Sequence, residues 1–255
     1  MESTQVGTQQ PELVSWRQHV RGRRVPQMVY AAVFTTCMAV LVVFSSNFGA
    51  PSLNAGEAAG ISPLAPMTEI TSLDLSGSPT TDLAMLAPFT NLISLDLSGT
   101  GVSDLSPLAS LTGLTTLFLD ANQITDISPL ASLSNLRTLK LGGNRISDVS
   151  PLASLTNLTS LSLGNNRISD IAPLASLTDL TSLNLGNNQV ADISPLADLT
   201  GLTTLFLDGN QISDISPLSS LSGAAWLWLG GNPLNAESVQ VCIPRLEARG
   251  VEIHR

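Results

Sequence analysis

Residues 135–156 have the sequence NLRTLKLGGNRISDVSPLASLT, one copy of a unit that recurs every 22 residues. Self-similarity at a short fixed period is typical of a solenoid, in which each unit buries its apolar edge against its neighbours. The period therefore predicts the fold, and it favours a binding surface over an enzyme. Full copies begin at Glu69, Asn91, Gly113, Asn135, Asn157, Asp179 and Gly201, and an atypical eighth begins at Gly223.

The apolar positions of the unit indicate a short strand. Leu139 and Leu141 alternate with Thr138, Lys140 and Gly142, which is a period of two. Equivalent strands of successive units must stack in parallel. Eight strands at a spacing of about 4.8 Å would give a sheet about 35 Å long.

An asparagine follows each strand where the chain turns. Its side chain can satisfy backbone groups that no strand partner reaches, and stacked turns would align these amides in a ladder. We expect a weaker ladder in the first two units, which have Ser78 and Thr100 at this position. The ladder positions are Asn122, Asn144, Asn166, Asn188, Asn210 and Asn232.

The Ser-Pro-Leu step later in the unit is a helix-start signal. Ser150 can cap and Pro151 fits the first helical position, so a short 3₁₀ segment is expected behind the sheet. Asp148 lies just before it and recurs in every full unit. A row of carboxylates could bind calcium, but we favour local capping of the turn backbone. The equivalents are Asp82, Asp104, Asp126, Asp170, Asp192 and Asp214.

The pattern Leu-x-x-Leu-x-Leu-x-x-Asn-x-Ile-x-Asp-Ile-x-Pro-Leu-x-x-Leu resembles the bacterial leucine-rich repeats of the internalin type, from Ile61 to about Ile253. The resemblance implies an α/β solenoid, a right-handed arc with a concave parallel β-sheet and a protein-binding role. Neither the internalin helical cap, nor a following immunoglobulin-like domain, nor a wall-sorting motif is recognised. Host-receptor binding and virulence are therefore not expected to carry over.

The segment before the repeats has a different composition. Residues 1–24 form a basic tail, expected to be disordered and cytoplasmic, and residues 25–48 are expected to form a transmembrane signal anchor. The uncharged run MVYAAVFTTCMAVLVVF (28–44) would span about 26 Å as a helix, and extension to residue 48 gives about 31 Å. The basic flank predicts that the repeats lie outside the cell, whether the segment is an anchor or a cleaved signal peptide. No small-x-small cleavage site directly follows the run, which favours the anchor over the signal peptide. A buried core helix is disfavoured because nothing is available to bury it.

Residues 49–60 are small and polar and are expected to form a flexible linker, followed by repeats over 61–234. Residues 61–68 match the second half of a unit and would close the amino-terminal end of the solenoid. The segment 235–255 is expected to form a C-terminal cap. In it Asn235 caps a helix over 236–243, Pro244 breaks or kinks that helix, Gly250 ends the segment's helical part, and 251–253 form an edge strand.

Composition restricts the function. The formal charge of −9 argues against nucleic-acid binding, which needs a basic face. Cys37 and Cys242 have neither disulfide-framework nor metal-ligand spacing. His19 and His254 lie at opposite ends of the chain, so no His-based catalytic or metal group is expected. We therefore expect no enzyme activity, no metal and no cofactor.

The variable strand positions should face a ligand on the concave side. Most are small and polar, and the exceptions are the candidate ligand-binding residues Phe118, Lys140, Phe206, Asp208, Trp226 and Trp228. Exposed aromatic residues on a rigid face are common interface anchors. The alternative for Trp226 and Trp228 is core packing under the cap. Asp74 and Asp96 should stand side by side, but an open sheet excludes no water for acid-base chemistry.

Together these features predict a non-catalytic protein-interaction module, displayed outside a bacterial cell membrane through residues 28–48. One alternative is a secreted or wall-associated adhesin that binds cell-wall glycan with its aromatic residues. A second is an intracellular regulator, like the phosphatase-regulatory subunits built on the same class of repeat.

Overall fold

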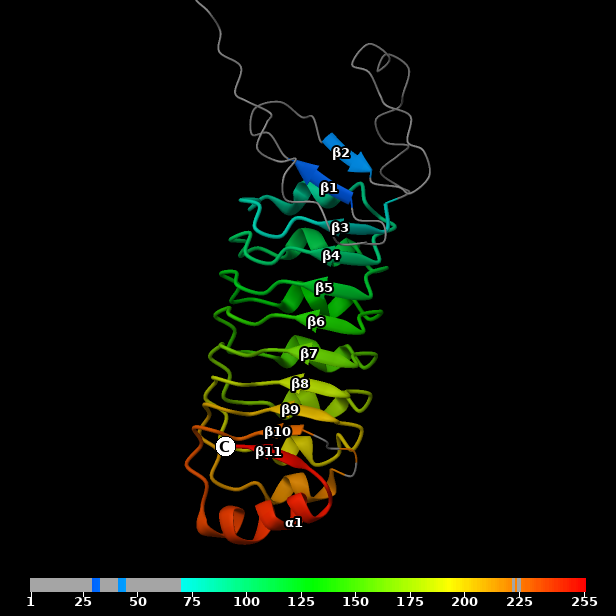
Figure 1. The fold of residues 1–255 in the computed structure, drawn as a ribbon. Helices are drawn as coiled ribbons and strands as arrows, with labels where there is room; N and C mark the ends of the chain where they lie inside the picture. The colour runs from blue at the N-terminus through cyan, green and yellow to red at the C-terminus, as the bar shows by residue number, and fades with distance from the viewer. Residues whose placement is uncertain (1–28, 33–40, 45–69, 222, 224–225) are drawn as a thin grey trace, which may run out of the picture.

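The computed structural model of the chain describes residues 29–32, 41–44, 70–221, 223 and 226–255. These residues form a column in which one turn of the chain lies on the next (Figure 1). Strands occupy one side of the column and short helices the opposite side. The strands β3–β11 are parallel and follow one another in sequence order, as stacked repeats require.

Each strand of the repeats is three residues long, with a buried leucine at its centre from β3 to β10 and the half-buried Ile253 in β11. Leu117 of β5 is paired with Leu139 of β6, and the same register is kept from β3 to β10. The aliphatic core is therefore continuous along the column, and Phe89 is its only aromatic member among the described residues. The strands are β3 Ser72–Asp74, β4 Ser94–Asp96, β5 Thr116–Phe118, β6 Thr138–Lys140, β7 Ser160–Ser162, β8 Ser182–Asn184, β9 Thr204–Phe206, β10 Trp226–Trp228 and β11 Glu252–His254.

Short 3₁₀ helices return the chain behind the sheet, as the Ser-Pro-Leu signal predicts. The proline does lie in the first turn, but the prediction that Ser150 caps the helix is wrong. Asp148 Oδ1 accepts the N–H of Ser150 at 2.8 Å, because a carboxylate two residues earlier reaches this donor directly. The helices are η4 Leu83–Leu86, η5 Ser106–Ser110, η6 Ser128–Ser132, η7 Ser150–Ser154, η8 Ala172–Ser176, η9 Ser194–Leu196 and η10 Ser216–Ser220.

The same aspartate contact recurs in all seven full units. Each carboxylate accepts a backbone N–H two residues later, at 2.8 or 2.9 Å. Local capping of the turn therefore accounts for the row. Hydrogen bonds from Ser150 lower the pKa of Asp148, and bonds from Ser106 and Ser194 lower the pKa of Asp104 and Asp192.

The asparagine ladder runs the length of the repeats. Asn144 Nδ2 donates to the carbonyls of Leu119 and Leu141 at 2.9 and 3.0 Å, and its Oδ1 accepts the N–H of Ile124. Equivalent bonds link Asn122, Asn166, Asn188, Asn210 and Asn232 to their neighbouring turns. At the earlier end Thr100 takes this place with a single donor, to Leu97 O. Each asparagine thus joins two turns through buried backbone groups.

The C-terminal segment covers the last turn of the core. It consists of the π-helical turn η11 (Ser238–Cys242), the helix α1 (Ile243–Ala248) and β11, which pairs with β10. Asn235 caps it by accepting the N–H of Ser238 at 2.8 Å, and Gly250 ends α1 with a φ of 89°. The sequence predicts that the helix breaks or kinks at Pro244, and it does not break there, because the helical turns that begin at Ala236 continue into α1. Pro244 lies in the first turn of α1, directly after the wider π turn, where a missing N–H is tolerated.

The expected helix over 25–48 is not found at the residues that the structure describes there. Val29–Ala32 forms β1 and Leu41–Phe44 forms β2, an antiparallel pair in which β1 also lies parallel to β3. Two physical reasons favour strands here. Valine, tyrosine and phenylalanine prefer strands, and without β1 the edge of β3 would be unpaired. Among the described residues, no helix has the length and apolar character needed to cross a membrane. The rest of this segment, the tail, the linker, the half unit 61–68 and Cys37 lie outside the described residues.

Candidate ligand-binding face

The side of the sheet turned away from the core carries all six candidate residues, and we call it the sheet face. Strand register fixes the order of its central row. Phe118 is paired with Lys140, and Phe206 is paired with Trp228. From β3 to β11 the central row is Asp74, Asp96, Phe118, Lys140, Ser162, Asn184, Phe206, Trp228 and His254.

At the N-terminal end, Asp74 and Asp96 stand side by side, as the repeat predicts. Their carboxylates accept backbone N–H groups of their own chain turns, from Ser76 at 2.9 Å and Ser98 at 2.8 Å. Both groups therefore stabilise the exit from their strands.

Around β5 and β6, Lys140 and Asp120 each contact a group of the neighbouring turn. Lys140 Nζ lies 4.7 Å from the ring centroid of Phe118, a cation–π contact. Asp120 Oδ1 accepts the N–H of Gly142 at 2.7 Å. Burial raises the pKa of Asp120 above its ordinary value, against the opposing effects of the Gly142 N–H and the Lys140 charge.

The middle of the sheet face has no bulky side chains in the row after the strands, because three successive turns have glycine there. A Cβ at Gly186 would stand 2.8 Å from Oδ1 of Asp208. The glycines therefore leave room for polar side chains to lie flat on the backbone. Those side chains are Asp120 over Gly142, Asn184 over Gly164 and Asp208 over Gly186. The sequence identified this row as small, but only the structure shows which side chains fill the space.

At the C-terminal end, three aromatic rings stack along the column. The ring centroids of Phe206 and Trp228 are 4.0 Å apart with planes 17° from parallel. Those of Trp228 and His254 are 4.7 Å apart and 15° from parallel. The stack is built by strand register, since all three residues occupy the central row of consecutive strands. It forms a rigid apolar ridge at the surface.

Trp226 lies beside this stack and is 47% exposed. Its Nε1 donates to Oε2 of Glu252 at 3.2 Å, which orients the indole. Trp228 is half-buried in the stack. Neither tryptophan therefore belongs to the core under the cap. The sequence left open whether they lie in that core or at the surface, and the structure places both at the surface.

Sequence reasoning missed His254, which was considered only as a catalytic residue. The missing signal was the alignment of the last strand with the repeat. Once Ile253 is set opposite Leu227, His254 falls opposite Trp228. His254 Nε2 also lies 3.4 Å from Oε1 of Glu252. The irregular segment between β10 and β11 conceals this alignment in the sequence.

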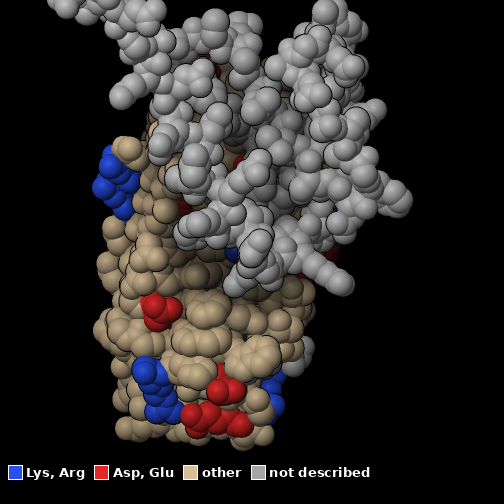
Figure 2. All heavy atoms as spheres, turned by 45° about the horizontal axis from the view of Figure 1, so that its top comes forward, with Lys and Arg blue, Asp and Glu red and all other residues tan. Residues whose placement is uncertain are grey.

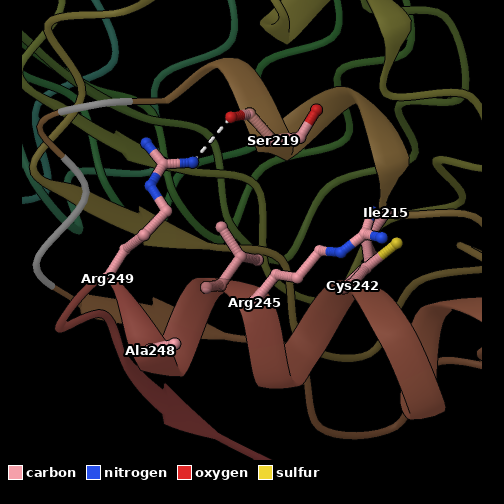
Figure 3. A pocket seen from close by; sticks show the side chains of 7 residues that line it. Ile215, Ser219, Cys242, Arg245, Ala248 and Arg249 are labelled. Atoms are coloured by element: carbon pink, nitrogen blue, oxygen red, sulfur yellow. Dashed lines mark hydrogen bonds between the residues drawn. The ribbon is translucent and has the colours of Figure 1, made fainter.

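A cavity of about 310 Å³ lies between the last repeat and the cap (Figure 3). Arg249 donates across this seam to the carbonyls of Ser219 at 2.7 Å and Leu221 at 2.8 Å. These bonds fasten the cap to the last turn. At the other end of the cavity, burial raises the pKa of the Cys242 thiol (Figure 3). The lining residues are Ile215, Ser219, Cys242, Arg245, Leu246, Ala248 and Arg249.

Charge is unevenly distributed over the molecule. On the side drawn in Figure 2, acidic and basic side chains gather toward the C-terminal end, below a band of uncharged residues. In the C-terminal segment, Arg255 and Glu247 form an ion pair at 2.8 Å. Within the part of the chain that the structure describes, no three His, Cys, Asp or Glu side chains are grouped so that they could hold a metal ion.

Comparison with known proteins supports this architecture. The family model for leucine-rich repeats in two copies matches residues 90–132, 134–176 and 178–220. Internalin C2 of Listeria monocytogenes is 42% identical, with a TM-score of 0.68, and the match covers 70% of this chain and 79% of that one. The internalin inlF of the same species is 36% identical, with a TM-score of 0.69, over 76% of this chain and 63% of that one. This chain thus spans less than two thirds of the inlF chain.

A leucine-rich repeat protein of Leptospira interrogans shares the fold at 22% identity, with a TM-score of 0.58 over 72% of this chain and 54% of that one. A search of the curated proteins finds no match. The family-model match extends over more than half of the sequence, and the internalin C2 match over more than two thirds of both chains. The chain therefore belongs to the leucine-rich repeat proteins and is of the internalin type.

Proposed function

We propose that this chain is a non-catalytic protein-binding module and that it contacts its partner with the C-terminal part of the sheet face. The observation that carries the proposal is the aromatic surface formed by Phe206, Trp228 and His254, with Trp226 exposed beside it. Preformed aromatic side chains lose little entropy on binding and are common interface anchors. The repeat class, whose members are interaction proteins, supports the same conclusion.

The central part of the face suits this role. Between β6 and β8, small side chains and polar side chains that lie flat over the glycines keep the face free of bulky groups, and the aromatic stack lies beside them. Such a face supplies contact area but no enclosed cavity for a small substrate.

We also propose that the repeats are displayed outside the cell membrane through residues 28–48. The proposal is supported by the uncharged run and by the basic residues that precede it, namely Arg17, Arg21, Arg23 and Arg24. In a bilayer this run would form a helix instead of pairing with β3, because all its backbone groups must be satisfied internally. Proteolysis of the repeats on intact cells tests this display, and full protection until lysis would contradict it.

Proximity labelling from the full chain on intact cells tests the binding function. We expect one or a few proteins to be labelled by the wild type and to be lost with Trp226→Ser and Phe206→Ser. The matched control is Ile93→Ser, because Ile93 is an equally exposed apolar side chain, at 48%, away from the stack. Equal labelling by all variants would place the partner elsewhere. Retention on purified cell wall with no protein labelled would favour the glycan-binding adhesin.

A further inference from the structure

Stacking determines which part of the aromatic rings a ligand can reach. Trp228 lies between Phe206 and His254, with ring centroids 4.0 and 4.7 Å away and nearly parallel planes. Both faces of its indole are therefore covered, and the ring turns its edge to solvent. Saccharide rings and quaternary ammonium groups bind aromatic faces, whereas ring edges suit aliphatic and aromatic side chains.

The hydrogen-bond donor of the Trp226 side chain is already engaged within the chain. The only N–H of the Trp226 side chain is donated to Glu252. Trp226 therefore offers a partner apolar area, while its polar atom is already engaged. The aromatic part of the site thus favours an apolar side chain over a hydroxyl-rich ligand.

Asp208 supplies the polar part of the site. Its counterpart in the unit at residues 113–134 is Asp120, which accepts the N–H of Gly142. The Asp208 carboxylate instead lies over Gly186, and among the described residues it accepts no hydrogen bond and forms no ion pair. Arg255, which directly follows β11, is paired with Glu247. A cation of the partner would find an unpaired carboxylate beside the stack.

We propose that this site takes a protein segment that sets an aliphatic or aromatic side chain against the edges of Phe206 and Trp228 and a neighbouring lysine or arginine against Asp208. The proposal rests on the proposed function and names the chemistry of the partner. An apolar anchor beside an ion pair gives both affinity and orientation. Phe118, although it has the same sequence context, lacks this arrangement because Lys140 covers its ring.

Selection of a phage-displayed library of random short peptides on the immobilised full chain tests the proposal. We expect enriched peptides with an apolar residue next to lysine or arginine. For the best peptide, measured by fluorescence anisotropy, Phe206→Ser should lower the affinity about tenfold or more, and Asp208→Asn about threefold to tenfold. The matched variants Phe118→Ser and Lys140→Ser should change the affinity less than about twofold.

Charge exchange provides the most selective measurement. Asp208→Lys should abolish binding of the basic peptide and bind a peptide in which the basic residue is replaced by glutamate. Enriched peptides without a basic residue, or binding lost with Phe118→Ser instead of Phe206→Ser, would overturn the proposal. Binding of an N-acetylglucosamine oligosaccharide that depends on Trp228 would also overturn the proposal. A library that yields no binder would overturn it as well. The proposed function fails separately, when proximity labelling finds no partner that depends on the sheet face.

Discussion

Residues 113–134 and 201–222 are two units of the same solenoid that differ at three positions, where Ala121, Thr125 and Ala131 are replaced by Gly209, Ser213 and Ser219. Both carry phenylalanine at the end of the strand and aspartate two residues later. Their surfaces nevertheless differ. In the first unit Lys140 lies over Phe118, and Asp120 bonds to Gly142. In the second, Trp228 stacks on Phe206, and the Asp208 carboxylate accepts no hydrogen bond among the described residues.

The comparison shows that a unit does not determine its own surface. Each side chain of the central row lies about 4.8 Å from the equivalent side chain of the next strand, so its environment is set mainly by that neighbour. In the next strand, Phe118 has Lys140 as its neighbour, whereas Phe206 has Trp228. Duplication of a unit therefore copies the scaffold, and the binding properties depend on the neighbouring turns.

The largest effect on stability should come from the ladder asparagine, which the two units share. Asn122→Ala and Asn210→Ala each remove a side chain that joins two turns, and each should lower the free energy of unfolding by about 3 kcal/mol, because buried carbonyls and N–H groups lose their partners. Urea unfolding of the full chain measures both. The exposed neighbours Gln123→Ala and Gln211→Ala are the controls and should change stability by less than about 0.5 kcal/mol. Asn122 Oδ1 also accepts the Gly101 N–H and the Thr100 hydroxyl, so a clearly larger loss with Asn210→Ala than with Asn122→Ala would contradict this account.

The next effect concerns the neighbour of the phenylalanine on the following strand, which differs between the two units. A double-mutant cycle between Phe206 and Trp228 should give a coupling of about 1 kcal/mol, since two stacked rings interact beyond their buried area. The equivalent cycle between Phe118 and Lys140 should give about 0.5 kcal/mol, because an exposed cation–π contact is weaker. Thermal unfolding of the four single and two double variants measures both. Equal couplings would mean that the neighbour matters less than the comparison indicates.

Much of this architecture could be predicted from the sequence, because turning and stacking impose the same demands on every unit. The strand leucines, the ladder asparagine Asn144 and the capping aspartate Asp148 each recur with the period, and each makes the same contact in each turn. One detail was wrong for a physical reason. Ser150 is a good capping residue in general, but Asp148 is nearer to the free N–H in this turn.

The candidate site could be predicted only in part. Phe206 and Trp228 stand out as breaks in the periodic pattern, so their proximity could be inferred from strand register. The role of His254 could not be inferred, because the segment between β10 and β11 interrupts the repeat. The conformations of Asp120 and Asp208 could not be inferred either, since Asp120 bonds to the N–H of Gly142 in the next turn, whereas Asp208 lies over Gly186 in the preceding turn. Residues 29–32 and 41–44 form strands where the apolar run predicts a helix, because hydropathy alone does not account for a free sheet edge.

The turns of the two units should also differ in their response to substitution. Gly209 has a φ of 64°, and a Cβ there would collide with the side chain of Asn187, so Gly209→Ala should cost about 1–2 kcal/mol. Ala121 occupies the equivalent place with a φ of 55°. Ala121→Gly should therefore stabilise by about 0.5 kcal/mol, the relief of strain being reduced by the entropy of glycine. Urea midpoints measure both changes. Destabilisation by Ala121→Gly would show that this turn is not strained.

The smallest effect should appear in the pH dependence of stability. Burial raises the pKa of Asp120 in the folded state, so between its unfolded and folded values the folded chain binds more protons, and stability from this group falls as pH rises. Asp120→Asn should remove that fall, an effect below about 1 kcal/mol because the carboxylate is partly exposed and screened. Asp148 provides the opposite sign. Its pKa is lowered by Ser150, so its contribution is present above the unfolded value and lost as pH falls through the folded one. Urea unfolding across the acidic range should therefore show Asp120→Asn and Asp148→Asn deviating from the wild type in opposite directions, and deviations of the same sign would mean that the Gly142 N–H outweighs burial at Asp120.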